Sequence, residues 1–332
     1  MSESWQPDVL GHGYEQLTLP LPDDAEGEVV ATLVRRTPMP RWLSWLRRMP
    51  LHDVDVLYVH GWSDYFFQTE LADFFAQRGA RFFGLDLRKY GRSIRPHQTP
   101  GYIDNLSEYD ADIEAALAAM QSTGRRVFLL GHSTGGLVFT LWVNRNPDRV
   151  DALILNSPWL ETQGSTIARL MMAPILRAQA KVNAVGKLPN VDLGFYSRSI
   201  DVDRDGEWQF NHDWRPERGF IAKRAWGAAI IAGHQTIAGG LSIDIPILTM
   251  LSKRSFISLT WNAVMKSSDI VLVVDDIAKR SLKLGETVTV VRLDGAIHDI
   301  FLSAKPVRDE AYRQLDLWLD GYARKRRRAR SS

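Results

Sequence analysis

Short apolar runs alternate with segments of helical periodicity along the first half of the chain. This alternation predicts a mostly parallel sheet that helices cover on both faces. The first two expected strands, Tyr14–Leu19 and Glu28–Arg35, form a hairpin-like pair because the turn-rich segment Pro22–Asp24 separates them. The other strands expected here are Asp55–Val59, Arg81–Leu85, Arg126–Leu130 and Ala152–Leu155, and the expected helices are Gln68–Arg78, Ser107–Gln121 and Leu137–Arg145.

The alternation stops between residues 159 and 240, where large apolar side chains stand among polar ones. Such a region is typical of a helical cap inserted into a sheet domain. Its large apolar side chains include Met171, Met172, Trp208, Phe210, Trp214, Phe220 and Trp226. The alternation then resumes with the expected strands Ile245–Leu251 and Thr287–Leu293 and the expected helices Asp276–Leu284 and Pro306–Ala323.

The expected fold class is therefore α/β, with eight strands in a mostly parallel sheet and an inserted helical cap. The expected division of the chain is a first part of the α/β core at 1–158, the cap at 159–240, a second part of the core at 241–323 and a basic disordered tail at 324–332.

A Gly-x-Ser-x-Gly pattern, Gly131–Gly135, follows directly on the apolar run Arg126–Leu130. A serine on a tight turn between a buried strand and a helix presents its hydroxyl at the edge of the sheet, and the flanking glycines let this strained turn close. The pattern predicts that Ser133 is a nucleophile.

A serine hydroxyl needs an adjacent base, and that base needs an acid to orient it. After an elbow of this type, the acid and then the histidine follow along the chain. The eight histidines include only one, His298, that lies after the last expected strand. We expect His298 to be the base.

Three aspartates, Asp269, Asp275 and Asp276, lie between the seventh expected strand and the base. Asp269 precedes His298 by 29 residues, which leaves room for the intervening helix and strand. Asp275 and Asp276 fit the first turn of that helix, where the helix dipole stabilises negative charge. Asp269 is therefore the favoured acid, and Asp275 is the alternative.

Acyl transfer also needs two backbone N–H groups that stabilise an oxyanion. The residue after the nucleophile, Thr134, should supply one of them. The other should come from Trp62, because Val59–Trp62 places the flexible Gly61 immediately before it at the end of a strand. The Trp62 ring is also expected to line the acyl pocket.

Four segments of the chain together resemble the serine aminopeptidase S33-like, or lysophospholipase and monoacylglycerol-lipase-like, α/β-hydrolases. They are His60–Gly61, Asp86–Ser93, Gly131–Gly136 and Gly295–His298. The resemblance covers most of the chain outside the cap and the tail. It implies the α/β-hydrolase fold and a serine hydrolase that acts on an ester without metal or cofactor, with Asp86–Ser93 serving the architecture. One departure is that residues 252–268 intervene before the acid, which in this family usually lies a few residues beyond the seventh strand.

Composition and charge limit the kinds of partner and site that the chain can have. Of the net charge of +2, six positive charges lie in the C-terminal run from Arg324 to Arg330, which leaves the rest near −4 and speaks against a nucleic-acid partner. The absence of cysteine excludes disulfides and thiolate metal sites. Residues 1–8 lack the features of a secretory signal, so the cytoplasm is the expected location.

Two further motifs have alternative explanations. The segment Pro40–Arg48 mixes indole rings with arginines and could rest on a lipid surface, although such segments more often pack on the edge of a domain. The aspartates Asp201, Asp203 and Asp205 are typical of a calcium loop, but Glu207 comes too soon to complete one. A solvated acidic turn is the expected explanation, and no metal site is expected.

These features predict a serine hydrolase of carboxylic esters, with a medium-chain acyl ester or a monoacyl lipid as substrate. Two alternatives remain: an aminopeptidase-like amidase, and a non-catalytic ligand-binding protein that retains the scaffold.

Overall fold

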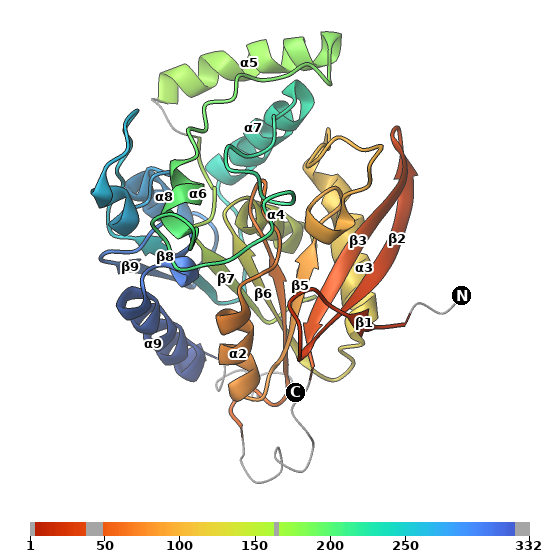
Figure 1. Ribbon diagram of the computed structural model, residues 1–332, viewed down its shortest axis with the longest axis vertical. Helices are drawn as coiled ribbons and strands as arrows, with labels where there is room; N and C mark the ends of the chain where they lie inside the picture. Colours follow the sequence, from red (N-terminus) through yellow and green to blue (C-terminus); the bar gives the residue numbers. More distant parts are fainter. Residues whose placement is uncertain (1–3, 38–48, 163–165, 323–332) are drawn as a thin grey trace.

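The computed structural model describes residues 4–37, 49–162 and 166–322, and in residues 166–173 it describes the backbone alone (Figure 1). Within these residues lies a nine-stranded sheet of order β1-β2-β3-β5-β4-β6-β7-β8-β9. The expected segments Pro40–Arg48 and 324–332, and the side chains of Met171 and Met172, lie outside what is described.

Six strands form the parallel part of the sheet, and their order is β5-β4-β6-β7-β8-β9. Three antiparallel strands, β1 to β3, complete it at the β5 edge. The strand bounds are β1 Gln6–Pro7, β2 Tyr14–Asp24, β3 Gly27–Arg36, β4 Val54–Val59, β5 Arg81–Asp86, β6 Arg126–His132, β7 Ala152–Asn156, β8 Ile247–Ser252 and β9 Val288–Leu293.

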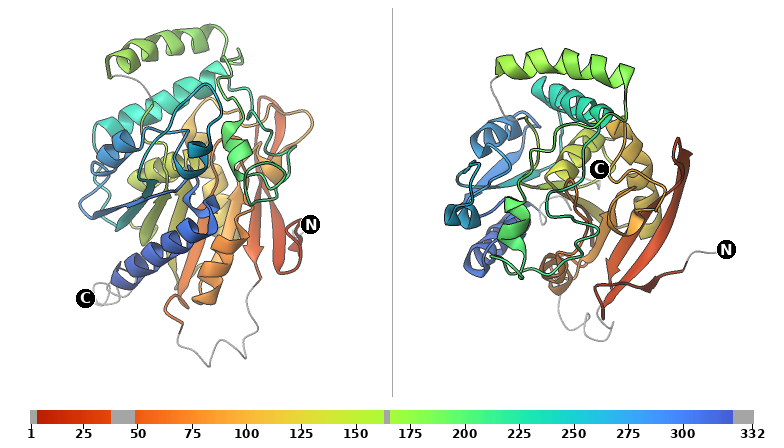
Figure 2. Two further views of the ribbon diagram at one scale, coloured as in Figure 1. Left: turned by 60° about the vertical axis from the view of Figure 1, so that its left-hand side comes forward. Right: turned by 45° about the horizontal axis from the view of Figure 1, so that its top comes forward.

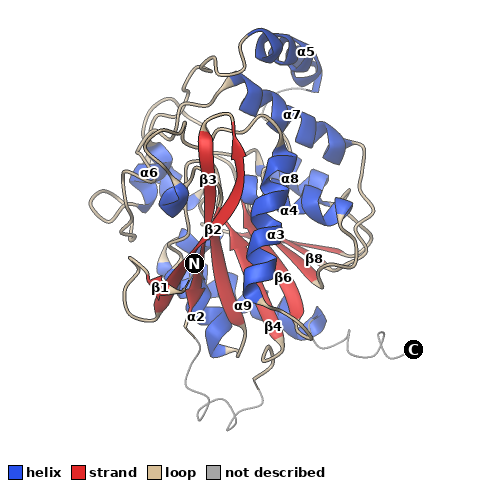
Figure 3. Ribbon diagram, turned by 90° about the vertical axis from the view of Figure 1, so that its right-hand side faces the viewer, coloured by secondary structure: helices blue, strands red, loops and turns tan. Residues whose placement is uncertain are grey.

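Helices cover both faces of the sheet. They are needed because successive side chains of a strand point to opposite faces, and in the central strands the side chains on both faces are apolar. In β4, Val56 and Tyr58 belong to one apolar cluster with α2 and α9, while Leu57 and Val59 belong to another with α3 and α4. Figure 3 shows α3 crossing the second of these faces. The helices that cover the sheet are α2 Thr69–Gln77, α3 Tyr109–Met120, α4 Thr134–Arg145, α8 Val274–Ser281 and α9 Lys305–Tyr322.

Within the described residues between β7 and β8, in the region expected to form a cap, lie the three helices α5 Thr166–Val182, α6 Phe195–Ile200 and α7 Arg224–Ala238. Figure 2 shows α5 and α7 side by side at one end of the molecule, with α5 outermost. Short 3₁₀ helices are η1 Gly91–Ser93, η2 Leu106–Glu108, η3 Ala263–Ser267 and η4 Ile300–Leu302. Among the described residues, no helix has both the length and the apolar character that crossing a membrane requires.

The α/β-hydrolase fold class is confirmed, with two local corrections. The expected turn at Pro22–Asp24 is wrong, because β2 continues to Asp24 through an irregularity of register after Leu21, and proline is tolerated at such a position. The sheet also has a ninth strand, β1, whose two residues are too few to produce an alternating pattern. The chain turns instead between Asp24 and Gly27.

The segment Asp86–Ser93 is held by buried ion pairs. Lys89 is almost fully buried, and its ammonium lies 2.6 Å from carboxylate oxygens of both Asp24 and Glu26 at the β2–β3 turn. Burial alone would raise the pKa of both carboxyl groups, but the hydrogen bonds and charge of Lys89, together with hydrogen bonds from backbone amides, outweigh it and hold the pKa of each below its ordinary value. These contacts fit the architectural role expected for the segment.

Replacing Lys89 with methionine should lower the free energy of unfolding by roughly 3 kcal/mol at pH 7, because two carboxylates lose a buried partner. A lowered pKa means that this stabilisation is present above the unfolded pKa, near 4, and is lost as pH falls through the folded pKa. Urea titrations of wild type and Lys89→Met at pH 7 and pH 3 should therefore show a smaller difference at pH 3. A difference that does not narrow would contradict this account of Lys89.

Candidate active site

Ser133 occupies a strained turn between β6 and α4. Its φ is 50° and its ψ is −114°, and its amide donates to the Asn156 carbonyl at the end of β7. The glycines are required here: a Cβ on Gly131 would lie 2.6 Å from the Gly135 carbonyl oxygen, and a Cβ on Gly135 would lie 2.5 Å from the His60 carbonyl oxygen. The elbow geometry thus follows from the Gly-x-Ser-x-Gly pattern.

Ser133, His298 and Asp269 lie in hydrogen-bonding sequence at the carboxyl ends of the parallel strands. The Ser133 Oγ is 3.0 Å from Nε2 of His298, and Nδ1 of His298 is 2.9 Å from Oδ2 of Asp269. The other carboxylate oxygen of Asp269 accepts the amides of Val271 and Leu272, each at 2.8 Å. All three side chains are buried, with the Asp269 carboxylate completely so. This arrangement can withdraw a proton from a serine hydroxyl.

The other two aspartates considered for the acid lie elsewhere. Asp275 and Asp276 stand in the first turn of α8, as their position in the sequence indicates. The Asp275 side chain is largely exposed and pairs with Arg292 at 2.6 Å. Neither aspartate is bonded to His298.

Residues 252–268, which precede Asp269 in the sequence, do not move Asp269 away from the end of β8. The chain leaves β8, passes through η3 and returns, so that the Asp269 amide donates to the Arg254 carbonyl at 3.1 Å. The Phe256 amide in turn donates to the Asp269 carbonyl at 2.8 Å. Asp269 therefore lies beside the first residues after β8, although many residues separate them in sequence.

The loop after β4 passes directly over the nucleophile. A Cβ on Gly61 would lie 3.1 Å from the Ser133 Cβ. Thr134 is the first residue of α4, so its amide is one of those that have no acceptor within the helix. Neither this amide nor that of Trp62 donates to a protein acceptor in the described part of the chain. Both N–H groups are thus free to bind an oxyanion.

His60 fixes the peptide that carries the Trp62 amide. The Leu87 amide donates to Nε2 of His60 at 3.2 Å, so the proton of the neutral ring stands on Nδ1, which donates to the Gly61 carbonyl at 2.7 Å. Burial lowers the pKa of His60 and favours this neutral form.

A buried polar network supports the loop of the base. Asp299 follows His298, and its carboxylate accepts from Asn156 Nδ2 at 2.6 Å and from Gln68 Nε2 at 3.1 Å. Its amide donates to the Tyr196 hydroxyl at 3.2 Å, and the Tyr196 ring meets the His298 ring edge-on at 5.4 Å. Burial raises the pKa of Tyr196 far above its ordinary value, so the phenol stays neutral.

Sequence reasoning missed this network, although one signal was present. Asn156 and Ser157 are polar residues at the end of a buried strand, where side chains of neighbouring parallel strands converge. Gln68 and Tyr196 carry no such signal, because nothing in the sequence indicates that they lie beside Asp299.

Aromatic side chains surround the loop after β4. The Trp62 ring lies 3.9 Å from that of Trp226 and meets Phe220 edge-on at 6.1 Å. Trp159 lies 5.9 Å from Trp226, and its amide donates to the Ser133 carbonyl at 2.9 Å. Three further rings thus lie in one cluster with the Trp62 ring, whose expected place in the acyl pocket stays a prediction.

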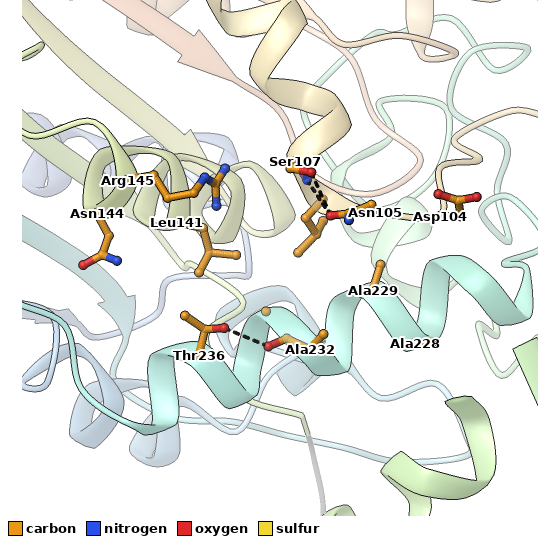
Figure 4. A pocket seen from close by; sticks show the side chains of 12 residues that line it. Asp104, Asn105, Ser107, Leu141, Asn144, Arg145, Ala228, Ala229, Ala232 and Thr236 are labelled. Atoms are coloured by element: carbon orange, nitrogen blue, oxygen red, sulfur yellow. Dashed lines mark hydrogen bonds between the residues drawn. The ribbon is translucent and has the colours of Figure 1, made fainter. Parts of the chain in front are cut away.

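A cavity of about 420 Å³ lies between α4, η2 and α7 (Figure 4). Leu106, Leu141 and Gly233 lie among its lining residues, and Asn105, Asn144 and Arg145 lie around them. None of Ser133, His298 or Asp269 lines it. It is therefore distinct from the candidate active site.

The acidic turn near α6 brings Asp201 and Asp203 beside His212, with one possible ligand atom of each within 4.8 Å of the others. Asp205 instead pairs with Arg198 at 2.5 Å. Asp203 and His212 are exposed, and exposed acidic groups commonly gather without an ion. The expected solvated turn stays a prediction.

Comparison with known proteins places this geometry in context. The model of the family described as serine aminopeptidase, S33, matches residues 52–253, more than half of the chain. The chain is 34% identical over 151 residues to phospholipase YtpA of Bacillus subtilis, and 29% identical over 146 residues to a monoglyceride lipase homolog of monkeypox virus. These matches cover 45% and 43% of this chain and 51% and 49% of the relatives, so the chain spans about half the length of the curated relatives it matches.

Solved structures share the fold. A monoacylglycerol lipase of Paleococcus ferrophilus superimposes with a TM-score of 0.59 at 18% identity, covering 81% of this chain and 94% of that one. A soluble variant of monoglyceride lipase from Saccharomyces cerevisiae, in complex with a substrate analog, superimposes with a TM-score of 0.61 at 14% identity. The match covers 97% of this chain and 94% of that one. At this identity the likeness shows the α/β-hydrolase fold.

Proposed function

The chain belongs to the serine aminopeptidase, S33, family, and from this premise we propose that it hydrolyses carboxylic esters through an acyl-enzyme on Ser133. The observation that carries the proposal is the hydrogen-bonded line from Ser133 Oγ through His298 to Asp269. A nucleophile, a base and an orienting acid in this order are what acyl transfer needs.

In the proposed mechanism, His298 Nε2 takes the hydroxyl proton while Ser133 Oγ attacks the ester carbonyl carbon. The amides of Trp62 and Thr134 hold the oxyanion. The carbonyl reforms as the alcohol leaves with the proton from His298. Water, deprotonated by the same imidazole, then attacks the acyl-enzyme, and the acid is released as His298 returns that proton to Ser133 Oγ.

The proposed substrate is a medium-chain acyl ester or a monoacyl lipid. The Trp62, Phe220 and Trp226 rings beside the oxyanion loop offer an apolar surface to an acyl chain. The names of the relatives, a phospholipase and a monoglyceride lipase homolog, agree with such a substrate. We propose that residues 159–240 act as the cap that shapes this pocket. A cytoplasmic location and peripheral membrane contact remain expectations.

The alternative of a non-catalytic binding protein gains no support from the position of the acid, because the Asp269 carboxylate lies 2.9 Å from Nδ1 of His298. The aminopeptidase-like amidase is instead the rival that an assay must test, because the family description names a peptidase.

A substrate panel separates the two. We expect kcat/KM for p-nitrophenyl esters to rise from acetate to a medium chain, since each buried methylene contributes about 0.8 kcal/mol of transfer free energy. Aminoacyl p-nitroanilides, measured beside them, should be turned over far more slowly. Preference for the anilides would overturn the ester proposal, and a flat profile across chain length would overturn the proposed acyl pocket.

A further inference from the structure

The loop that carries the Trp62 amide is hydrogen-bonded to the region between β7 and β8. The Ser63 Oγ accepts the Phe220 amide at 3.0 Å, and the Tyr65 hydroxyl accepts the Asn211 amide at 2.7 Å. Ser63 has φ 53°, a left-handed conformation that an ordinary residue adopts only at a cost. A strained loop of this kind persists where its surroundings hold it.

A third connection between the same two regions is a buried ion pair. Nε of Arg215 donates to Oδ1 of Asp64 at 3.1 Å, and the two side chains are only 6% and 5% exposed. Burial raises the pKa of Asp64, and the charge of Arg215 acts in the opposite direction. Asp64 stands two residues after Trp62, so this pair fixes the loop close to the expected oxyanion donor.

Arg215 also reaches the side of the base. Its Nη1 donates to the Ser197 Oγ at 2.8 Å, and its guanidinium carbon lies 5.0 Å from the centre of the Tyr196 ring. That ring contacts His298 edge-on. One guanidinium therefore touches both the loop that follows β4 and the ring that packs against the base.

We propose that Arg215 is a positioning residue for this site: paired with Asp64, it holds the Trp62 amide where the oxyanion forms and keeps Tyr196 against His298. This inference rests on the proposed function. Donors act on a developing charge only in precise geometry, and misplacement by about 1 Å can cost about a hundredfold in rate. The planar fork of arginine, which lysine lacks, lets it bond Asp64 and Ser197 at once.

The first experiment compares Arg215→Met with wild type on the best ester of the panel. We expect kcat to fall by about tenfold or more with KM changed less than about threefold, because the lost contacts act on the transition state. Arg215→Lys should recover only part of kcat. A trifluoromethyl ketone, which forms an oxyanion on the serine, should lose affinity by the same factor as kcat/KM.

Arg280→Met is the matched control. Arg280 forms another largely buried ion pair, with Glu161, and this pair joins α8 to the segment after β7. Loss of this ion pair in Arg280→Met should lower the melting temperature about as much as Arg215→Met does, while kcat stays within about twofold of wild type. An equal fall of kcat in both variants would mean that the Arg215 effect is general destabilisation, which would overturn the proposal.

The double variant Asp64→Asn with Arg215→Met removes both buried charges. Replacing a buried pair as a whole is often neutral for stability, so the melting temperature should recover. The proposal expects kcat to stay low, and recovery of kcat together with stability would overturn it. If wild type turns over no ester, the proposed function fails and this inference with it. Wild-type turnover combined with an unchanged kcat in Arg215→Met overturns this inference alone.

Discussion

Replacing Ser133 with alanine is expected to abolish turnover of a p-nitrophenyl ester, with a fall in kcat of about 10⁶. The substitution removes the atom on which the proposed acyl-enzyme forms and leaves the main chain of the elbow in place. Ser281→Ala is the control, because Ser281 is likewise a buried serine but its hydroxyl donates to the Ile277 carbonyl within α8. We expect this control to retain wild-type kcat.

The measurement is steady-state hydrolysis by purified variants, with circular dichroism to show that each is folded. Turnover by folded Ser133→Ala within a hundredfold of wild type would mean that another group attacks the ester.

Replacing Asp269 with asparagine is expected to lower kcat by about 10⁴. The oxygen that accepts the Val271 and Leu272 amides must remain an acceptor, so the asparagine carbonyl takes that place. Its NH₂ group then faces His298 Nδ1 and forces the imidazole proton onto Nε2. In that tautomer the ring cannot accept the proton of Ser133.

Asp275→Asn makes the same chemical change at the alternative acid. Its exposed pair with Arg292 contributes little, so kcat should stay within about twofold of wild type. The comparison reads kcat for the two variants side by side. A large loss in Asp275→Asn together with a small loss in Asp269→Asn would reverse the assignment of the acid.

The parallel core could be predicted from the sequence because its strands are short apolar runs, such as Arg126–Leu130, and most of them are followed by a helical pattern. The strained turn that carries Ser133 could be predicted because the constraint is local: Gly131 and Gly135 are needed where a Cβ would strike the neighbouring backbone. The structure differs from the sequence prediction at strand β1 and at the turn after β2. At both places, pairing with neighbouring strands of the sheet outweighs the local turn and strand propensities of the residues.

The assignments of His298 as the base and Asp269 as the acid depended on their order along the chain rather than on a local sequence pattern. Asp269 could be named because it leaves room for α8 and β9 before His298, and the structure places the two side chains 2.9 Å apart. Arg215 and Asp64 could not be predicted, since 151 residues separate them and neither lies in a motif. Their pairing follows from how the segment between β7 and β8 folds back over the loop after β4.

The central claim, that Ser133 is the activated nucleophile, is tested most directly with a fluorophosphonate probe and mass spectrometry of the labelled peptide. The account predicts one phosphonyl adduct, on the peptide containing Ser133, with labelling lost in Ser133→Ala and strongly slowed in Asp269→Asn. A folded wild-type protein that takes up no probe, or that carries the adduct on another residue, would contradict it.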